Sequence, residues 1–277
     1  FIYHTDENGS VLNSGIYGST GESSQRSRSA IQASDNNFVI FGGVSSPSSL
    51  SEIFVIKIAQ WTGTTLWARV IGTSNFDYGM SIVQRDDDGF VGTGNMGTPY
   101  NPYNMYLLYM DQDGNEELSL AIGGSDNDLG NDVIKAGDGN YVLAGSTASI
   151  GAGFYDFYIL KVDQDGNQLW SSAIGGASPD AAYAIVEAAD GGYLVCGETS
   201  SYGSGSIDMW LIKTDDTGNP EWSWAFGGSS QEYGYDLFLD DNGCIYVCGA
   251  TSTYSAGGLD GLLVKFSPDG KTCLGRI

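Results

Sequence analysis

The sequence predicts an all-β fold made of repeated four-stranded antiparallel units, and three observations support this. A unit of about fifty residues recurs along nearly the whole chain. Each copy contains short runs rich in β-branched and aromatic residues, such as Phe157–Val162 and Tyr193–Thr199. Asp-Gly, Gly-Gly and Ser/Gly clusters bound these runs, as is usual at the turns of hairpins. No window keeps a helical period over three turns, so strands are expected throughout.

Two glycine positions mark the repeat. The first is the Gly of a tight turn, and the second ends a short apolar run. The turn Gly recurs at Gly9, Gly63, Gly114, Gly166, Gly218 and Gly270, and the second Gly recurs at Gly42, Gly94, Gly145, Gly197 and Gly249. A period of this length is typical of a solenoid or a propeller, and four short strands per unit predict the blades of a β-propeller.

The clearest copy predicts the order of strands within a blade. Its strands, from the axis outward, are expected at Ala181–Ala189, Tyr193–Thr199, Met209–Thr214 and Glu221–Phe226. Tight turns at 190–192 and 216–218 then lie on one face of the blade. The long loop 200–208 and the Gly227-Gly228 crossover to the next blade share the opposite face.

Applied to the whole chain, this register gives five complete blades plus an N-terminal hairpin, in a five- or six-bladed ring. Phe1–Tyr17 matches strands three and four of a blade, and Lys271–Ile277 would be the last strand. We expect a single propeller domain over 1–277, with repeats at 1–53, 54–104, 105–156, 157–208, 209–260 and a partial one at 261–277. The start at Phe1, without Met, favours either a piece of a longer chain or a five-bladed ring with an appended hairpin.

The repeats resemble a known family. The stretch Gly227–Gly270, with its Gly-Gly pair, Glu-Tyr-Gly, Asp-Asn-Gly turn and Tyr-Val-Cys-Gly-Ala-Thr strand, is similar to the SBBP repeat of secreted bacterial and archaeal propellers. Three tryptophans that follow the turn Gly resemble the tryptophan-docking motif of quinoprotein propellers: Trp67, Trp170 and Trp222. The resemblance implies a secreted propeller in which these rings pack between blades. It says little about activity.

Composition limits the partners of the chain. Lys and Arg number 11 against 34 Asp and Glu, which gives a formal charge of −23. Such a surface repels phosphate backbones and anionic lipids, so no nucleic-acid partner is expected. No apolar stretch reaches the roughly 20 residues of a membrane helix, so no transmembrane segment is expected. The 41 Gly and the scarcity of Lys favour an extracellular or cell-surface location.

The four cysteines suggest neither a disulfide framework nor a metal site. Cys196 and Cys248 occupy the same position of strand two in successive blades, where both are expected to be small buried side chains. Cys244 and Cys273 fall on strands that are not neighbours in the predicted order.

Acidic residues recur at two positions on the long-loop face. One set follows the crossover glycines and the other closes the long loops: Asp77, Asp128, Asp180 and Glu232, then Asp156, Asp208 and Asp260. Two interpretations stay open. The acids could converge on calcium, which takes six to eight oxygen ligands, or each could fix its own loop by accepting backbone N–H bonds.

The long loops are rich in Ser, Gly and Tyr, the composition of many recognition loops. They place five tyrosines on one rim, and we predict that these bind a ligand: Tyr100, Tyr103, Tyr155, Tyr202 and Tyr254.

These features favour a non-enzymatic extracellular or cell-surface propeller, acting as a binding, adhesion or assembly module for a protein or glycan partner, with self-assembly a further option. No catalytic residues are expected, because the only histidine, His4, occupies a position where other copies have Lys. One alternative is a structural subunit of a surface filament or sheath. Another is a carbohydrate-active propeller enzyme, which would need two carboxylates of different pKa.

Overall fold

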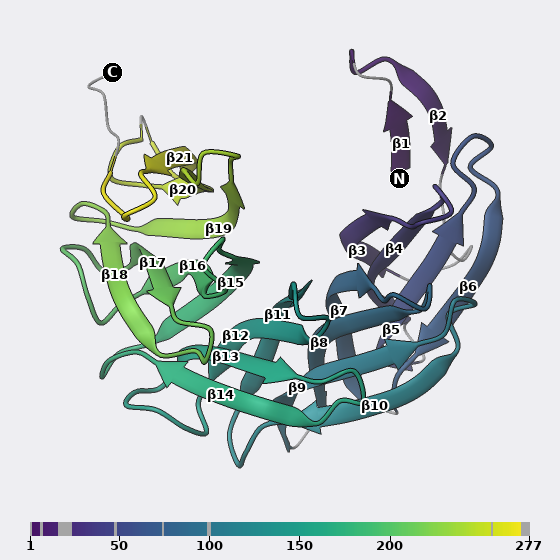
Figure 1. The fold of residues 1–277 in the computed structure, drawn as a ribbon, viewed down its shortest axis with the longest axis horizontal. Coiled ribbons are helices and arrows are strands. Elements are labelled where there is room, and N and C mark those ends of the chain that lie inside the picture. Colours follow the sequence, from purple (N-terminus) through teal and green to yellow (C-terminus); the bar gives the residue numbers. More distant parts are fainter. Residues whose placement is uncertain are drawn as a thin grey trace. The chain divides into compact units, whose positions relative to one another are not determined.

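The computed structural model describes residues 2–5, 8–15, 24–46, 49–73, 75–98, 101–255 and 257–272. Every regular element in these ranges is a β-strand, and each sheet is antiparallel with its strands in chain order (Figure 1). No helix in the described ranges is long and apolar enough to cross a membrane. The chain divides into two compact units, Phe1–Ala121 and Ile122–Ile277.

The first unit contains a hairpin and two four-stranded sheets. The hairpin joins β1 (Ile2–Thr5) to β2 (Val11–Gly15). One sheet contains β3 (Ser24–Gln32), β4 (Phe38–Ser46), β5 (Ser49–Ile58) and β6 (Thr65–Ile71). The other contains β7 (Phe76–Gln84), β8 (Phe90–Thr98), β9 (Asn101–Met110) and β10 (Glu116–Ile122). β7 packs against the sheet before it, so these two sheets share a core.

The second unit contains three sheets that pack one on the next in the same way. The first contains β11 (Asp128–Lys135), β12 (Tyr141–Thr147), β13 (Asp156–Val162) and β14 (Gln168–Ile174). The second contains β15 (Asp180–Glu187), β16 (Tyr193–Thr199), β17 (Asp208–Thr214) and β18 (Pro220–Phe226). The third contains β19 (Glu232–Leu239), β20 (Ile245–Thr251) and β21 (Asp260–Phe266).

This architecture confirms the predicted fold class, an all-β propeller of four-stranded antiparallel blades, and fits the predicted number of blades. In the best-predicted blade the strands end within a residue or two of their expected bounds. Of the expected last strand, residues 273–277 lie outside the described ranges, and Thr272 forms a bridge to Phe266. The expectation of a single domain over 1–277 stays a prediction.

The docking tryptophans pack between blades, as predicted. Trp170, on β14, joins the apolar core between its own sheet and the next, and its ring centroid lies 5.8 Å from that of Tyr193. The indole also covers the turn of the next blade, where a Cβ on Gly218 would come within 2.6 Å of it. Gly218 has a φ of 81°, so both backbone conformation and close packing favour glycine there.

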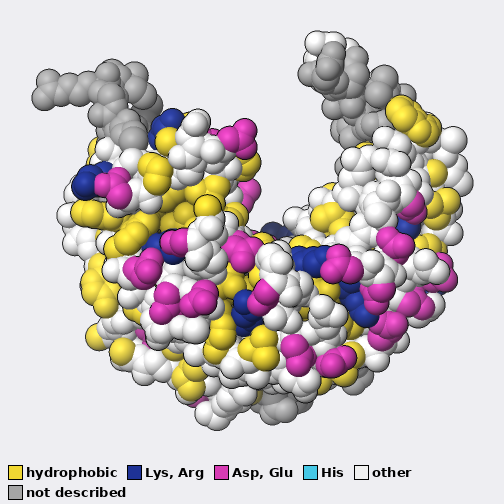
Figure 2. All heavy atoms as spheres, in the orientation of Figure 1, with side chains coloured by type: hydrophobic (Ala, Val, Ile, Leu, Met, Phe, Trp, Pro, Cys, Tyr) yellow, Lys and Arg dark blue, Asp and Glu magenta, His cyan; other side chains and the backbone are white. Residues whose placement is uncertain are grey.

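A repeated lysine on strand three ties the first tight turn of its blade to the sheet. Ion pairs of 2.7–2.9 Å join Lys57 to Asp35, Lys161 to Asp138 and Lys213 to Asp190. The three ammonium groups are largely buried and the carboxylates about half exposed, so salt screens these pairs less than it screens fully exposed pairs. Many of the other carboxylates lie on the visible surface of each unit (Figure 2).

Each inner strand contains a β-bulge at the same position. The bulge inserts one extra residue opposite its neighbouring strand and redirects side chains there. The extra residues are Arg28, Met80, Asn131, Tyr183 and Tyr235. These five residues are of four types, a cation, a thioether, an amide and two phenols, so the repeat preserves the backbone feature while the side chain varies.

The two cysteines of strand two differ, which corrects one prediction. Cys196 is fully buried and its Sγ lies 3.5 Å from the Gly234 carbonyl of the next sheet. Cys248 is exposed instead, because no sheet in the described ranges packs on that face of β20. Position in the repeat therefore predicts burial only where a following blade covers the face.

Candidate functional site

The predicted calcium-binding acids lie mostly inside the blades rather than on their surface. Six of them are buried to 1% exposure or less: Asp77, Asp128, Asp156, Asp180, Asp208 and Glu232. Asp260 is exposed. The buried carboxylates bind N–H and O–H groups of their own loops, as in the loop-fixing interpretation.

Asp156 and Asp180 are two buried acids that both approach the same glycine and both keep an unused oxygen. Asp156 Oδ2 accepts hydrogen bonds from the backbone N–H groups of Ala152 and Gly153, at 2.7 and 3.2 Å. Both carboxylates approach Gly175, since Asp156 Oδ1 and Asp180 Oδ2 lie 1.8 and 2.8 Å from the place that a Cβ there would take. The Oδ1 atom of each residue is buried and has no hydrogen-bond partner among the described residues.

The next pair, Asp208 and Glu232, is better satisfied. Glu232 Oε2 accepts the Gly228 N–H at 2.7 Å, and its Oε1 accepts the Thr251 hydroxyl at 2.8 Å. The longer side chain therefore reaches partners on both oxygens. No group of three or more His, Cys, Asp or Glu side chains in the described part of the chain is placed to hold a metal ion. Calcium binding by these acids stays a prediction.

The predicted ligand-binding tyrosines use their side chains within the blades. The Tyr202 hydroxyl donates to the Gly175 carbonyl at 3.2 Å, and the Tyr155 hydroxyl accepts from Asn127 at 3.0 Å. Tyr254, which is 61% exposed, makes the same type of contact as Tyr202, and Tyr103 packs beside Tyr78. Tyr100 lies outside the described residues. A role for this set in ligand binding stays a prediction.

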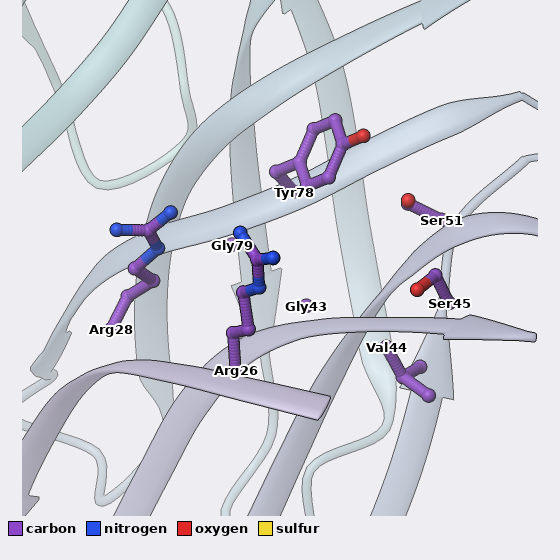
Figure 3. Close-up of a pocket in the computed structure, with 8 residues that line it drawn as sticks. All are labelled: Arg26, Arg28, Gly43, Val44, Ser45, Ser51, Tyr78 and Gly79. Atoms are coloured by element: carbon purple, nitrogen blue, oxygen red, sulfur yellow. The ribbon is translucent and has the colours of Figure 1, made fainter. Parts of the chain in front are cut away.

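The first unit has a pocket that the sequence analysis did not identify. We call it the arginine pocket, and its lining residues are Arg26, Arg28, Gly43, Val44, Ser45, Ser51, Tyr78 and Gly79. Its volume is about 230 Å³. The two arginines extend from β3 toward the strand that carries Tyr78 and Gly79 (Figure 3). The Tyr78 ring lies over Gly43, 3.5 Å from the place that a Cβ would take.

The second unit has an aromatic and acidic cluster at the corresponding strand positions. This tyrosine–glutamate cluster consists of Tyr183, Glu198, Tyr233 and Tyr235. The rings of Tyr233 and Tyr235 stack with an interplanar angle of 12° and centroids 5.7 Å apart. The centroid of Tyr183 lies 5.9 Å from that of Tyr235. Tyr235 is 49% exposed, so the cluster reaches the solvent.

Glu198 is the acid of this cluster. Burial raises the pKa of Glu198, while a hydrogen bond with Tyr183 acts in the opposite direction. Its Oε2 atom is buried and has no hydrogen-bond partner among the described residues. Burial and the charge of Glu198 also raise the pKa of Tyr183 and of Tyr233. The environment thus favours the neutral acid.

This arrangement has the properties of a proton-donor site. A carboxyl group with a raised pKa keeps its proton nearer to neutral pH, where it can serve as a general acid. The neighbouring rings offer flat apolar faces with polar hydroxyl ends, which suits a ligand that has both C–H and O–H groups. No other described acid shifts the pKa of Glu198, so the cluster contains one candidate proton donor and no second carboxylate coupled to it.

Sequence reasoning missed both sites because a β-bulge is defined by how two strands pair. The sequence of one strand alone does not reveal it. A weaker signal was present for each. Arg26 and Arg28 are two of only 11 basic residues, and they are two positions apart. Glu198 is the one acid at its position of strand two, where other copies have Gly43, Asn95, Ser146 and Ala250.

No family model matches the chain. A curated relative, the regulatory protein FlaEY of Caulobacter vibrioides, is 26% identical over 160 residues, which are 50% of this chain and 16% of that protein. The chain therefore spans about a sixth of that relative's length.

Solved structures share the fold at low identity. The Pan2 WD40 domain of Neurospora crassa has a TM-score of 0.59 at 11% identity, over 90% of this chain and 65% of that one. The gluconolactonase XC5397 of Xanthomonas campestris has a TM-score of 0.50 at 12% identity, over 90% and 74%. The RS223 β-xylosidase also has a TM-score of 0.50, at 10% identity over 90% and 94%.

These likenesses support a propeller repeat protein and correct the predicted function. The expectation of a non-enzymatic surface module is overturned, because enzymes that include a β-xylosidase and a gluconolactonase are prominent among the proteins of similar fold. The finding agrees better with the alternative of a carbohydrate-active propeller enzyme. Identities this low establish the fold alone.

Proposed function

We propose that this protein is a carbohydrate-active propeller enzyme that cleaves glycosidic bonds, with Glu198 as its proton donor. The observation that supports this best is the raised pKa of Glu198 beside the stacked rings of Tyr233 and Tyr235. Glycoside hydrolysis needs a carboxylic acid that is still protonated when it meets the leaving-group oxygen. An ordinary exposed Glu has lost most of its proton at neutral pH.

The rest of the cluster has supporting roles in this proposal. Tyr183 is a positioning residue in this proposal, since its interaction with Glu198 lowers the pKa of that carboxyl and its ring lies beside Tyr235. Tyr235 presents an exposed ring face on which a sugar can stack. Tyr233 completes the platform by stacking behind it.

The test is hydrolysis of β-xylo-oligosaccharides and alkyl α-arabinofuranosides, whose leaving groups need a proton to depart, together with opening of gluconolactone. We expect turnover of at least one glycoside, and a loss of at least about 100-fold in kcat for Glu198→Gln. The control is Glu221→Gln, which removes an exposed acid from β18 of the same blade. Equal glycoside turnover by the two variants would refute the role of Glu198. Turnover of the lactone alone would mean that the enzyme is a lactonase and not a glycosidase.

The variant Tyr183→Phe tests whether Tyr183 positions the Glu198 carboxyl or only packs beside it. It keeps the ring but removes the hydrogen bond that lowers the pKa of Glu198. The basic limb of the kcat profile should therefore move to higher pH. A lower kcat with an unmoved pH profile would indicate a structural role only.

Three further properties belong to this proposal. They are the relationship to SBBP repeats, the extracellular or cell-surface location, and a glycan as the natural ligand. A protein partner, self-assembly and bound calcium stay predictions.

A further inference from the structure

Arg26 and Arg28 differ from five of the other basic side chains. Ion pairs to Asp or Glu hold Lys57, Arg85, Lys161, Lys213 and Lys271. In the ranges that the structure describes, neither Arg26 nor Arg28 has an ion pair, although the chain contains 34 acids. Both arginines are exposed. Two cations that have no ion pair to a described carboxylate therefore line one pocket.

The bulge in β3 explains why the two guanidinium groups share that pocket. Arg26 pairs with Gly43 across the strands, and Arg28 is the extra residue between Ser27 and Ser29. Because Gly43 has no side chain, the space opposite Arg26 stays open and the Tyr78 ring forms its wall. Two like charges that line one pocket repel each other, and an anion between them would offset that repulsion.

The other lining groups suit a small polar ligand. Ser45 and Ser51 add hydroxyl groups, and Tyr78 adds an aromatic wall. The volume of about 230 Å³ is below the roughly 300–1,000 Å³ of pockets for drug-sized ligands. One sugar-sized group is therefore a better match than an extended chain.

We propose that the arginine pocket binds the anionic group of an acidic sugar, a carboxylate or a sulfate, between Arg26 and Arg28. Each guanidinium presents a planar fork of N–H donors that matches the oxygens of such a group. The serine hydroxyls then face the hydroxyls of the sugar, and its ring lies against Tyr78. Binding in this pocket involves no catalytic step, so the proposal goes beyond the proposed enzyme activity.

The experiment is titration calorimetry of the Glu198→Gln protein, in which turnover cannot interfere, with glucuronate, glucose 6-sulfate and neutral glucose. We expect one or both anionic sugars to bind at least about tenfold more tightly than glucose, since hydrogen bonds to charged groups are the stronger ones. Binding of glucuronate alone, or of the sulfate alone, identifies the anion. Equal binding of glucose and both anions would overturn the proposal.

Arg26→Gln and Arg28→Gln, singly and together, test the residues. Each should weaken binding of the anionic sugar about tenfold or more and leave the weak binding of glucose unchanged. Arg69→Gln is the matched control, because it removes an arginine of the same unit that bonds to Asn115 outside the pocket. An equal loss in the control would mean that only net charge matters. If a variant unfolds, the parent protein still tests the proposal. Raised salt must weaken its binding of the anionic sugar, because salt screens the charges of the site.

Discussion

The arginine pocket of the first unit and the tyrosine–glutamate cluster of the second occupy the same positions of their blades but differ in charge. Arg26 and Tyr233 both lie two positions before the bulge residue, and Arg28 and Tyr235 are the bulge residues themselves. One blade presents two guanidinium groups there, and the other presents two stacked rings beside a carboxyl group. The repeat thus determines where a side chain points, and the residue type determines the chemistry.

The strands that carry Tyr78 and Tyr233 also begin differently. Asp77 precedes Tyr78, and Glu232 precedes Tyr233. Asp77 Oδ2 accepts two hydrogen bonds from Thr73, at 2.6 and 3.0 Å, while its Oδ1 has no partner among the described residues. Both oxygens of Glu232 are bonded. One methylene group therefore decides whether the buried acid is satisfied.

The largest change should come from removing the scaffold under one of the two sites. Trp170→Ala deletes a ring from the core of the second unit and uncovers Gly218, so we expect a loss of about 3–5 kcal/mol. Thermal unfolding measures this. Trp61→Ala is the control, because that side chain is 74% exposed. Equal melting temperatures for the two variants would mean that Trp170 does not hold the blades together.

The next largest effect should be a difference in stability between variants of Glu232 and of Asp77. Glu232→Gln leaves an N–H group facing N–H or O–H donors, which should cost about 1.5–3 kcal/mol. Asp77→Asn keeps one oxygen for Thr73 and removes a buried charge, so it should be neutral or stabilising. Urea unfolding at pH 7 tests both. A destabilised Asp77→Asn would show that its second oxygen has a partner after all.

The pH dependence of these two acids should have opposite signs. Burial raises the pKa of Glu232, but hydrogen bonds from Gly228, Thr253 and Thr251 prevail and lower it from 4.5. Its stabilising contribution is present above that value and is lost as the pH falls through the lowered pKa. Burial and the charge of Glu52 raise the pKa of Asp77 above 3.8. Its ionisation therefore destabilises the fold as the pH rises through the raised pKa.

Glu198 should behave like Asp77, because burial raises the pKa of its carboxyl group too. The folded state then favours the protonated acid, and its contribution to stability falls as the pH rises through the raised pKa. Glu198→Gln should remove this slope, so the variant should gain stability relative to the parent as pH increases. Melting temperatures between pH 4 and pH 8 measure the difference. A difference that stays constant over that range would mean that Glu198 has the pKa of an exposed acid.

The sequence allowed the strands to be predicted but not the chemistry between them. The turn glycines and apolar runs are local signals, so the bounds of β16 and β17 follow from them to within a residue. The bulges at Arg28 and Tyr235 depend on pairing between strands. The burial of Asp180 depends on the crossover from the preceding blade, whose Gly176 N–H binds it at 2.8 Å. The exposure of Cys248 depends on what covers the sheet. Such features arise from tertiary structure and leave little local pattern.

The smallest expected effect concerns calcium at Asp156 and Asp180, the pair in which each residue keeps a buried oxygen without a described partner. Calcium binds oxygens at about 2.3–2.6 Å, and the two carboxylates approach the same glycine through Asp156 Oδ1 and Asp180 Oδ2. At ten times its dissociation constant, calcium would stabilise the fold by about 1.4 kcal/mol. The melting temperature should therefore rise slightly with millimolar calcium and fall with chelator. Asp180→Asn should abolish the response, whereas Glu232→Gln should preserve it, since Glu232 has no unused oxygen. A response that survives Asp180→Asn would assign the ion to another site, and the absence of any response would leave both acids with the loop-fixing role alone.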